Sequence, residues 1–366
     1  MPINFNPVYT ITPEIANALM RIEAAKQAIV DLPITPAVLI SLRETARLYS
    51  THYSTMIEGN LLTQEEVNRV VLGHQHFPGR ERDEGEVKGY YTALDEVERL
   101  ASTQKPITEK AIQKLHALAT AEGRGRAKAT PYRDGQNVIR DAKTGSIVYM
   151  PPEAKDVSGL MQGLVTWLKE SEKDKLPCPI RAGIAHYQFA TINPYYDGNG
   201  RSARLLTTLI LHLGGYDLKD LNSLEEYYAQ NLSAYYQALT VGPSHNYYLG
   251  RVKADISDWV LVFCEGMSVA FEKVKQRATE AALAGAKDQS PVLRKLNARQ
   301  RKALTLFQYS ETITAKDVGA LFGFKPRTAS EVCRRWLNEG FLVAVDTSRK
   351  ARKYQLAKTY ANLIEH

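Results

Sequence analysis

The sequence is poor in several features that mark specialised protein classes. Its three cysteines, Cys178, Cys264 and Cys333, are too few and too scattered for a disulfide framework or a zinc site. The N-terminus lacks the basic start and apolar run of a signal peptide. No stretch approaches the roughly 18 consecutive apolar residues of a membrane span. These absences predict a cytoplasmic protein without membrane contact, whose cysteines are small buried groups in a reducing compartment.

Length and charge indicate how the chain is divided into domains more than what its activity is. A chain of 366 residues exceeds a single domain of about 150 residues, so two or three domains are expected. With 44% hydrophobic and 24% charged residues, the composition is that of an ordinary globular protein. The formal net charge of +7 suggests an anionic partner. Lys and Arg are frequent from Leu293 to Lys358, where a solvated basic surface is the simpler alternative.

The spacing of apolar residues predicts a mainly α-helical protein. Residues 1–110 are expected to form an N-terminal helical region, residues 111–280 a helical core, residues 281–292 a linker and residues 293–366 a small separate domain. Helix N-caps are predicted at Thr63, with Glu66 three residues later, and at Thr108. Single helices are also expected over residues 223–240 and 253–280.

The run NPYYDGNGRSAR at residues 193–204 lies between two strongly helical segments. Two glycines within three residues let its backbone approach a ligand closely, and the helix that follows offers free N–H groups and a positive dipole end. Arg201 and Arg204 fall on the first turn of that helix, and Asp197 supplies a hard oxygen ligand of the kind that Mg²⁺ prefers. Together these groups predict a magnesium–polyphosphate site. The alternative is a Gly-rich turn with surface arginines; the Walker A and Rossmann glycine patterns are absent.

This run resembles the signature of the Fic family, HPFx[DE]GNGRxxR, and HYQFATI at residues 186–192 resembles the helix that leads into it. The resemblance extends from about Leu42 to Leu239. It implies an all-helical core with a β-hairpin flap that transfers AMP from ATP to a hydroxyl group of a target protein, with Asp197 binding Mg²⁺. The residues that it implies for phosphate binding are Gly198, Asn199, Gly200, Arg201, Ser202, Ala203 and Arg204.

Asn193 departs from the family pattern, which has a catalytic histidine there. An amide has no titratable group near neutral pH, so Asn193 cannot deprotonate a hydroxyl group, and loss of a general base typically costs about 10²–10⁴-fold in rate. His186 lies about 10 Å earlier along a helix and is expected to be a packing residue. His74 and His76 are expected to be loop residues. Transfer is therefore predicted to be impaired, whereas nucleotide binding need not suffer.

Residues 54–60, STMIEGN, match the inhibitory pattern [ST]xxxE[GN] of the family. In relatives, a helix with this pattern packs beside the active site, and its glutamate, here Glu58, pairs with the second arginine of the motif, here Arg204. A carboxylate on that guanidinium competes with the γ-phosphate of ATP, so Glu58 is expected to restrain the site in cis. The alternative is an ordinary helix end with a glycine C-cap.

A hairpin is predicted at residues 136–150, where two β-leaning runs flank a Gly-containing turn. An isolated hairpin is marginal in water, so it must lean on helices or on a partner. By resemblance it is the family's flap, on which the target protein docks by main-chain hydrogen bonds; a purely structural hairpin is the alternative. The resemblance also places Asn231 at the nucleoside, among tyrosines that could equally belong to the core.

Residues 293–366 resemble a winged helix-turn-helix. The run ITAKDVGALFGF predicts a helix and a turn at Gly323, and Lys325 to Leu337 predicts a second helix with Pro near its start. LVAV and KYQL, with residues 348–350 between them, predict the wing. A basic second helix suits a DNA groove. Winged helices also serve as protein-interaction or dimer modules, so a homodimer is the alternative expectation.

Two functions are consistent with the complete phosphate-binding run, the inhibitory pattern and the missing histidine. One is an ATP-dependent, autoinhibited protein adenylyltransferase that Asn193 impairs. The other is a catalytically silent Fic protein that senses nucleotide and acts on DNA or on a protein partner. The complete run from Asp197 to Arg204 and the inhibitory pattern favour the first function, and Asn193 favours the second.

Overall fold

The computed structural model describes residues 2–32, 34, 36–73, 75–121, 127–140, 144–221, 223–242, 244–285, 295–307, 310–346 and 352–361. The chain forms two compact units, one of Met1–Val30 with Thr45–Lys275 and one of Asp31–Glu44 with Gln276–His366. Helices dominate, as the sequence predicts. His74, most of the predicted linker and residues 348–350 of the predicted wing lie outside the described residues. Among the helices that are described, none combines the length and hydropathy that crossing a bilayer requires.

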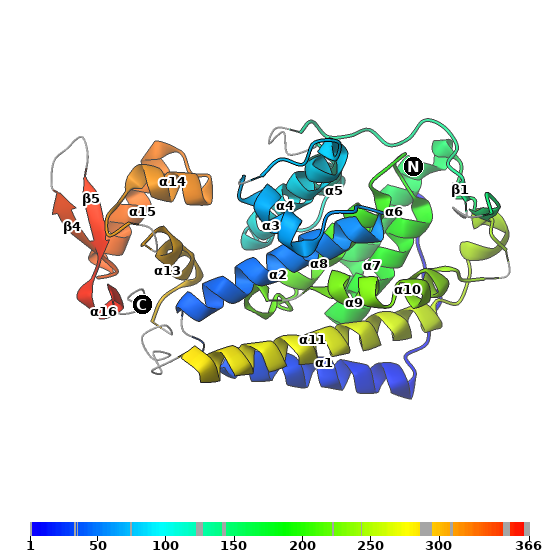
Figure 1. Cartoon of the computed structure of the whole chain (residues 1–366). Coiled ribbons are helices and arrows are strands. Elements are labelled where there is room, and N and C mark those ends of the chain that lie inside the picture. Colours follow the sequence, from blue (N-terminus) through cyan, green and yellow to red (C-terminus); the bar gives the residue numbers. More distant parts are fainter. Residues whose placement is uncertain are drawn as a thin grey trace. The chain divides into compact units, whose positions relative to one another are not determined.

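Helices α7 (Cys178–Ile192) and α8 (Asn199–Leu213) form the centre of the first unit, where they pack side by side (Figure 1). Nearly every residue of α7 is buried, as expected for a helix that carries few charged side chains on any face. Helices α4 (Glu81–Ser102), α5 (Glu109–Thr120) and α6 (Ala154–Lys173) pack against this pair. The loop between α7 and α8, residues 193–198, is called the motif loop below.

The remaining helices of the first unit frame this core. Helices α1 (Pro13–Asp31) and α11 (Ser257–Gly285) lie side by side (Figure 1), and an ion pair of 3.0 Å joins Arg21 Nε to Glu272 Oε1. Helix α2 (Pro36–Ile57) ends next to Glu58 and precedes α3 (Gln64–Val71). The predicted capping box of Thr63 with Glu66 and the predicted cap at Thr108 are both present.

The predicted hairpin is present and leans on the rest of the unit. Strands β1 (Ile139–Arg140) and β2 (Ile147–Tyr149) pair antiparallel, with Ile139 opposite Tyr149. Tyr149 is buried, and its hydroxyl donates to the carbonyl of Thr191 at 2.7 Å. Directly after β2, Met150 N donates to the carbonyl of His245 at 2.8 Å. These contacts supply the support that a hairpin of this size needs.

Two predicted helices have different extents in the structure. Residues 223–240 form two helices, α9 (Leu224–Gln230) and α10 (Leu232–Leu239). They part at Asn231, whose Nδ2 donates to the carbonyl of Tyr227 at 2.9 Å and so competes with the helical backbone. Helix α11 begins at Ser257 instead of near residue 253. Just before it, Asp255 Oδ1 accepts from Ser257 N at 2.9 Å and holds the chain in a turn. The short helical turns η1 (Leu218–Asp220) and the π-helical η2 (Tyr247–Arg251) complete the region.

The second unit contains a three-stranded sheet and several short helices. In chain order the elements are α13 (Ala298–Ala303), η3 (Leu304–Phe307), β3 (Ile313–Thr314), α14 (Ala315–Phe322), α15 (Pro326–Asn338), β4 (Leu342–Asp346), β5 (Lys353–Leu356) and α16 (Lys358–Ala361). The sheet order is β3-β5-β4 and all pairs are antiparallel. Trp336 and Phe341 lie at its core, and Gly323 makes the turn between α14 and α15 with φ of +66°. This order of elements is the one expected for a winged helix-turn-helix, and that assignment stays a prediction.

Candidate functional site

The motif loop begins and ends with left-handed backbone. Asn193 ends α7 with φ of +50° and ψ of +62°, a conformation that asparagine tolerates better than most residues. Gly198 precedes α8 with φ of +73°, and a side chain there would also collide with Thr120, 2.7 Å from the Cβ position. The loop therefore turns sharply enough to place the first turn of α8 beside the end of α7.

The side chain of Asn193 links the hairpin to α8. Its Oδ1 accepts hydrogen bonds from Asn137 Nδ2 at 2.7 Å and from Asn199 Nδ2 at 3.2 Å. The same two donors also reach the carbonyl of Tyr195, both at 2.7 Å. The carboxamide of Asn193 is therefore a structural link between the start of the hairpin and the helix that carries the two arginines.

Arg133, which the sequence analysis did not single out, holds the same region together. It is buried, and its Nε donates to the carbonyl of Asn193 at 2.9 Å. Its Nη1 donates to the carbonyl of Gly135 at 2.8 Å, and its Nη2 donates to that of Pro152. One guanidinium thus fastens both ends of the hairpin to the C-terminus of α7, where a cation is favoured by the helix dipole. Nothing in the local sequence distinguishes Arg133 from a surface arginine.

Arg204 and Glu58 form the ion pair that the sequence predicts. Glu58 Oε1 lies 2.8 Å from Arg204 Nη2, and Arg204 is 2% exposed. Ser54 holds the same guanidinium: its hydroxyl accepts from Nε at 2.8 Å and its carbonyl from Nη2 at 2.9 Å. Burial lowers the pKa of Arg204, but its interactions with Glu58, Tyr235 and Tyr90 together outweigh burial, so the pKa is raised overall. Arg204 is therefore a permanent cation tied to α2.

The Glu58 carboxylate also touches the first turn of α8. A Cβ atom at Gly200 would lie 2.0 Å from Glu58 Oε1, so only glycine leaves room for this oxygen. The N-terminal turn of a helix attracts anions through its free N–H groups and its dipole. Glu58 thus lies where the sequence predicts that a phosphate binds.

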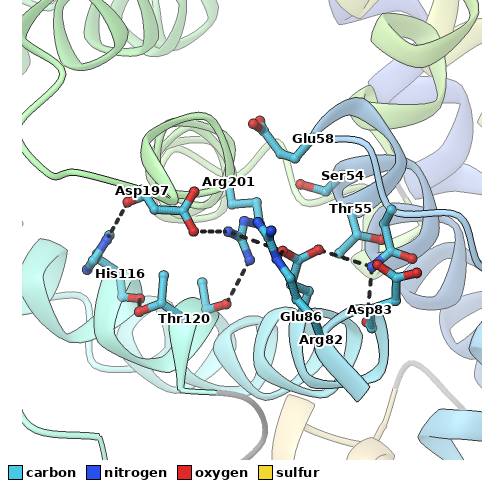
Figure 2. A network of polar contacts seen from close by, with 12 residues as sticks. Ser54, Thr55, Glu58, Arg82, Asp83, Glu86, His116, Thr120, Asp197 and Arg201 are labelled. Carbon is cyan, nitrogen blue, oxygen red and sulfur yellow. Dashed lines mark hydrogen bonds and ion pairs between the residues drawn. The ribbon is translucent and has the colours of Figure 1, made fainter. Parts of the chain in front are cut away.

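Arg201 is shared between two carboxylates (Figure 2). Its Nη2 lies 3.3 Å from Asp197 Oδ2 and 3.9 Å from Glu86 Oε1, and its Nη1 donates to the carbonyl of Ala119 at 3.3 Å. Arg201 and Glu86 are buried, whereas the side chain of Asp197 is 70% exposed. Sequence reasoning missed Glu86, which is one of several acidic residues on α4 and carries no motif.

Each motif arginine has one buried N–H group without an acceptor among the described residues. These groups are Nε of Arg201 and Nη1 of Arg204. Buried guanidinium N–H groups are normally bonded, so this pair fits an oxyanion with several oxygens, such as a polyphosphate. Mg²⁺ in nucleotide sites takes one or two carboxylates together with phosphate oxygens. The described residues hold no group of three or more metal-ligating side chains, so Asp197 fits Mg²⁺ only with phosphates bound.

Two predicted phosphate ligands differ from expectation. Ser202 N donates to the carbonyl of Gly198 at 3.0 Å, inside the helix, and the side chains of Ser202 and Ala203 are buried in the core. The reason is their position: by the fourth residue of a helix the backbone N–H is already bonded internally. The N–H groups left for a ligand belong to Asn199, Gly200 and Arg201.

Comparison with known proteins shows which family this region resembles. Residues 106–211, which span α5 to α8, match the Fic/DOC family. Over these residues the chain is similar to a Fic/DOC domain. Among curated proteins it is similar to those named protein adenylyltransferase Fic from Drosophila grimshawi and from Drosophila virilis, each 27% identical over 199 residues. These matches cover 54% of this chain and 40% and 39% of the relatives, so the chain spans about two fifths of their length.

Solved structures show that the Fic fold extends over most of the chain. A Fic family protein from Desulfovibrio desulfuricans G20 superposes with a TM-score of 0.60 at 23% identity, covering 97% of this chain and 99% of that one. A Fic domain containing signaling protein from Bacteroides thetaiotaomicron VPI-5482 gives a TM-score of 0.61 at 22% identity, covering 75% and 98%. At these identities the comparisons establish a common fold.

The two histidines within residues 106–211, His116 and His186, are both hydrogen-bonded. His186 Nδ1 pairs with Thr207 Oγ1 at 2.9 Å and Nε2 with the Tyr235 hydroxyl at 2.8 Å; burial lowers its pKa to about 3. His116 Nε2 pairs with the carbonyl of Asp197 at 2.9 Å, and burial lowers its pKa to about 4. His186 is therefore the packing residue expected, and His116 orients the loop that carries Asp197. His76 lies in a loop and pairs with Glu84.

The residues expected at the nucleoside are Asn231 and the tyrosines around it, and they differ in burial. Tyr228 and Tyr235 are buried, as in the core alternative, Tyr227 is half-buried, and Tyr236 and Asn231 are exposed. Tyr236 lies close to the Glu58 segment, with its hydroxyl 3.4 Å from the carbonyl of Ile57. The role of Asn231 at a nucleoside stays a prediction.

Proposed function

We propose that this chain binds ATP with Mg²⁺ and transfers AMP to a hydroxyl side chain of a target protein, and that Glu58 restrains the reaction in cis. The observation that carries the proposal is the position of the Glu58 carboxylate, 2.8 Å from Arg204 Nη2 and against Gly200 at the start of α8. A carboxylate in this position takes the place of a phosphate. The name protein adenylyltransferase, carried by the curated relatives, supports the reaction type.

In the proposed reaction, the target hydroxyl oxygen bonds to the α-phosphorus, the bond to the β-phosphate oxygen breaks, and pyrophosphate leaves. Arg201, Arg204 and the first turn of α8 bind the phosphates and stabilise the charge that moves onto the leaving group. Asp197 holds Mg²⁺, which neutralises phosphate charge. Asn193 cannot take the hydroxyl proton, which passes to solvent, so we expect a slow enzyme.

The hairpin is the proposed docking place of the target protein. Ile139 and Ile147 are apolar yet exposed on its strands. Tyr196 of the motif loop is 62% exposed beside it, with its hydroxyl donating to Asp134 Oδ1 at 2.6 Å. A short exposed strand pair can align an extended target segment by main-chain hydrogen bonds and leave the choice of side chain to its neighbours.

Incubation with α-labelled ATP and Mg²⁺ tests this function. The native protein, Glu58→Gly, Asn193→His and the double variant are compared for ATP affinity and for self-labelling. Glu58→Gly is expected to bind ATP more tightly and to label weakly. The double variant is expected to label about 10²–10⁴-fold faster, because it regains a general base.

Other outcomes would point elsewhere. Labelling that requires Asn193→His would indicate that the native chain is a nucleotide-sensing regulator without transferase activity. If Glu58→Gly changed neither the affinity for ATP nor the labelling, the proposed restraint would be rejected.

For the second unit we propose binding to DNA through α15. Arg327, Ser330 and Arg334 lie on the exposed side of this helix, opposite Ala329, Cys333 and Trp336 in the core. A helix with a buried apolar side and a basic outer side can enter a major groove and contact its phosphates. Sedimentation analysis distinguishes the alternative, a homodimer module.

A further inference from the structure

A second contact connects residues 54–60 to Arg201 through Glu86, which lies beside Arg201 in Figure 2. Asn60, two residues after Glu58, donates from Nδ2 to Glu86 Oε2 at 3.1 Å. The other oxygen of Glu86 lies 3.9 Å from Arg201 Nη2. The segment that places Glu58 on Arg204 therefore also reaches Arg201, through one intervening carboxylate.

Asn60 is fixed firmly enough to make this contact specific. It is buried, its backbone N donates to the carbonyl of Thr55 at 3.1 Å, and its Nδ2 also donates to the carbonyl of Asp83 at 3.0 Å. Its Oδ1 accepts from Leu62 N at 3.1 Å. Only Gly59, with φ of +93°, separates Asn60 from Glu58. Movement of this segment would therefore change both contacts.

Glu86 competes with any phosphate for the same guanidinium. Its side chain is 11% exposed, so its attraction for Arg201 is weakly screened by water. Two donors hold Glu86 back from Arg201: Asn60 Nδ2 on Oε2, and Arg82 Nε on Oε1 at 3.3 Å. The distance of 3.9 Å between Glu86 and Arg201 is longer than a hydrogen bond. If Asn60 is removed, the carboxylate loses one donor and is expected to turn to Arg201.

We propose that Glu86 is a positioning residue that sets how strongly Arg201 binds phosphate, and that Asn60 tunes it. The 54–60 segment then acts on both motif arginines: Glu58 occupies Arg204 directly, and Asn60 keeps Glu86 away from Arg201. This inference rests on the proposed binding of ATP at the site. In this proposal Glu86 acts through Arg201 and not by contact with the substrate.

The test is a double-mutant cycle in the Glu58→Gly background, where the direct restraint is absent. Dissociation constants for Mg·ATP are measured by calorimetry. Glu86→Gln keeps the shape of the side chain but removes the competing charge, so ATP affinity is expected to rise about fivefold. Asn60→Ala is expected to lower ATP affinity about threefold. With both changes present, the affinity should equal that of Glu86→Gln, because Asn60 has no charge left to restrain.

Glu84, two residues before Glu86 on the same helix, provides a matched control. Glu84 is also buried on α4, but it pairs with Lys88 and His76, and within the described part of the chain it contacts neither Arg201 nor Arg204. Glu84→Gln should leave ATP affinity unchanged, and thermal unfolding of each variant checks that it is folded. Glu86→Asp, which retains charge on a shorter side chain, should give an intermediate affinity.

Three results are decisive against the inference. Equal ATP affinity of Glu86→Gln and its parent would remove Glu86 as a competitor. If Asn60→Ala lowered ATP affinity equally in the parent and in the Glu86→Gln variant, Asn60 would not act through Glu86. If Glu58→Gly bound no ATP at all, the proposed function itself would fail, and this inference with it.

Discussion

Glu58 Oε1 lies 2.8 Å from Arg204 Nη2, and the same oxygen occupies the space that a Cβ at Gly200 would take. One carboxylate therefore meets a guanidinium and a helix N-terminus at once, which are the two groups that proteins use most often for phosphates. The contact joins residues 146 positions apart in the chain. A segment far upstream of the motif thus lies where we propose that a phosphate binds.

The hydrogen bond from Arg204 Nε to Ser54 Oγ should contribute measurably to stability. Ser54→Ala leaves a buried guanidinium donor without a partner, which costs about 1–3 kcal/mol. Urea unfolding at neutral pH should show this loss in the free energy of unfolding. Ser158→Ala is the control, because Ser158 is exposed and accepts only a long bond of 3.4 Å from Gln162. Equal losses in the two variants would contradict the assigned importance of Ser54.

Arg133 should determine how firmly the hairpin is held. Arg133→Lys keeps the charge, but an ammonium cannot reach the carbonyls of Asn193, Gly135 and Pro152 together. We expect a loss of about 2 kcal/mol and faster amide hydrogen exchange in β1 and β2 than in α7. Arg140→Lys serves for comparison, since Arg140 is exposed and its hydrogen bond among the described residues stays within the hairpin, to the carbonyl of Gly145. Unchanged exchange in Arg133→Lys would refute this role.

Acid should destabilise the protein partly through its buried histidines. Burial lowers the pKa of His186 to about 3 and that of His116 to about 4, from 6.5. Between these values and 6.5, the unfolded chain binds protons that the folded chain does not. Stability is therefore complete above pH 6.5 and falls as the pH drops towards 4, by about 1.4 kcal/mol per pH unit for each histidine.

Replacement of His186 isolates its share of this dependence. His186→Gln should reduce the slope of unfolding free energy against pH by about 1.4 kcal/mol per pH unit between pH 4.5 and 6. Urea unfolding at several pH values measures it. His245→Gln, at an exposed histidine, should leave the slope as it is. A slope unaffected by His186→Gln would mean that His186 is charged in the folded protein.

Binding of the second unit to DNA has a simple electrostatic signature. Fluorescence anisotropy with a short duplex should show affinity that falls linearly with the logarithm of salt concentration. Arg334→Ala should lower the magnitude of that slope by about 1 if its guanidinium contacts a phosphate. Arg140→Ala, an exposed arginine of the first unit, should have no effect. Affinity for DNA that does not depend on salt, or no binding to DNA at all, would favour the protein-interaction or dimer alternative.

Local features of this protein were predictable because neighbouring residues cause them. The caps at Thr63 and Thr108 need only residues three positions apart, and the hairpin needs only a turn between two β-leaning runs. The break at Asn231 was missed because the tyrosine-rich pattern around it is helical throughout, and the competing bond depends on one side-chain rotamer.

The sequence by itself determined the helical fold and the run from Asp197 to Arg204, since both follow from spacing along the chain. It also determined that no base stands at Asn193, which is a matter of side-chain chemistry. Only the tertiary structure decided that Arg133 fastens the hairpin, that Asn193 links it to α8, and that Glu86 shares Arg201 with Asp197. These contacts join segments far apart in the chain, and a buried polar group takes whichever partner packing brings within hydrogen-bond distance.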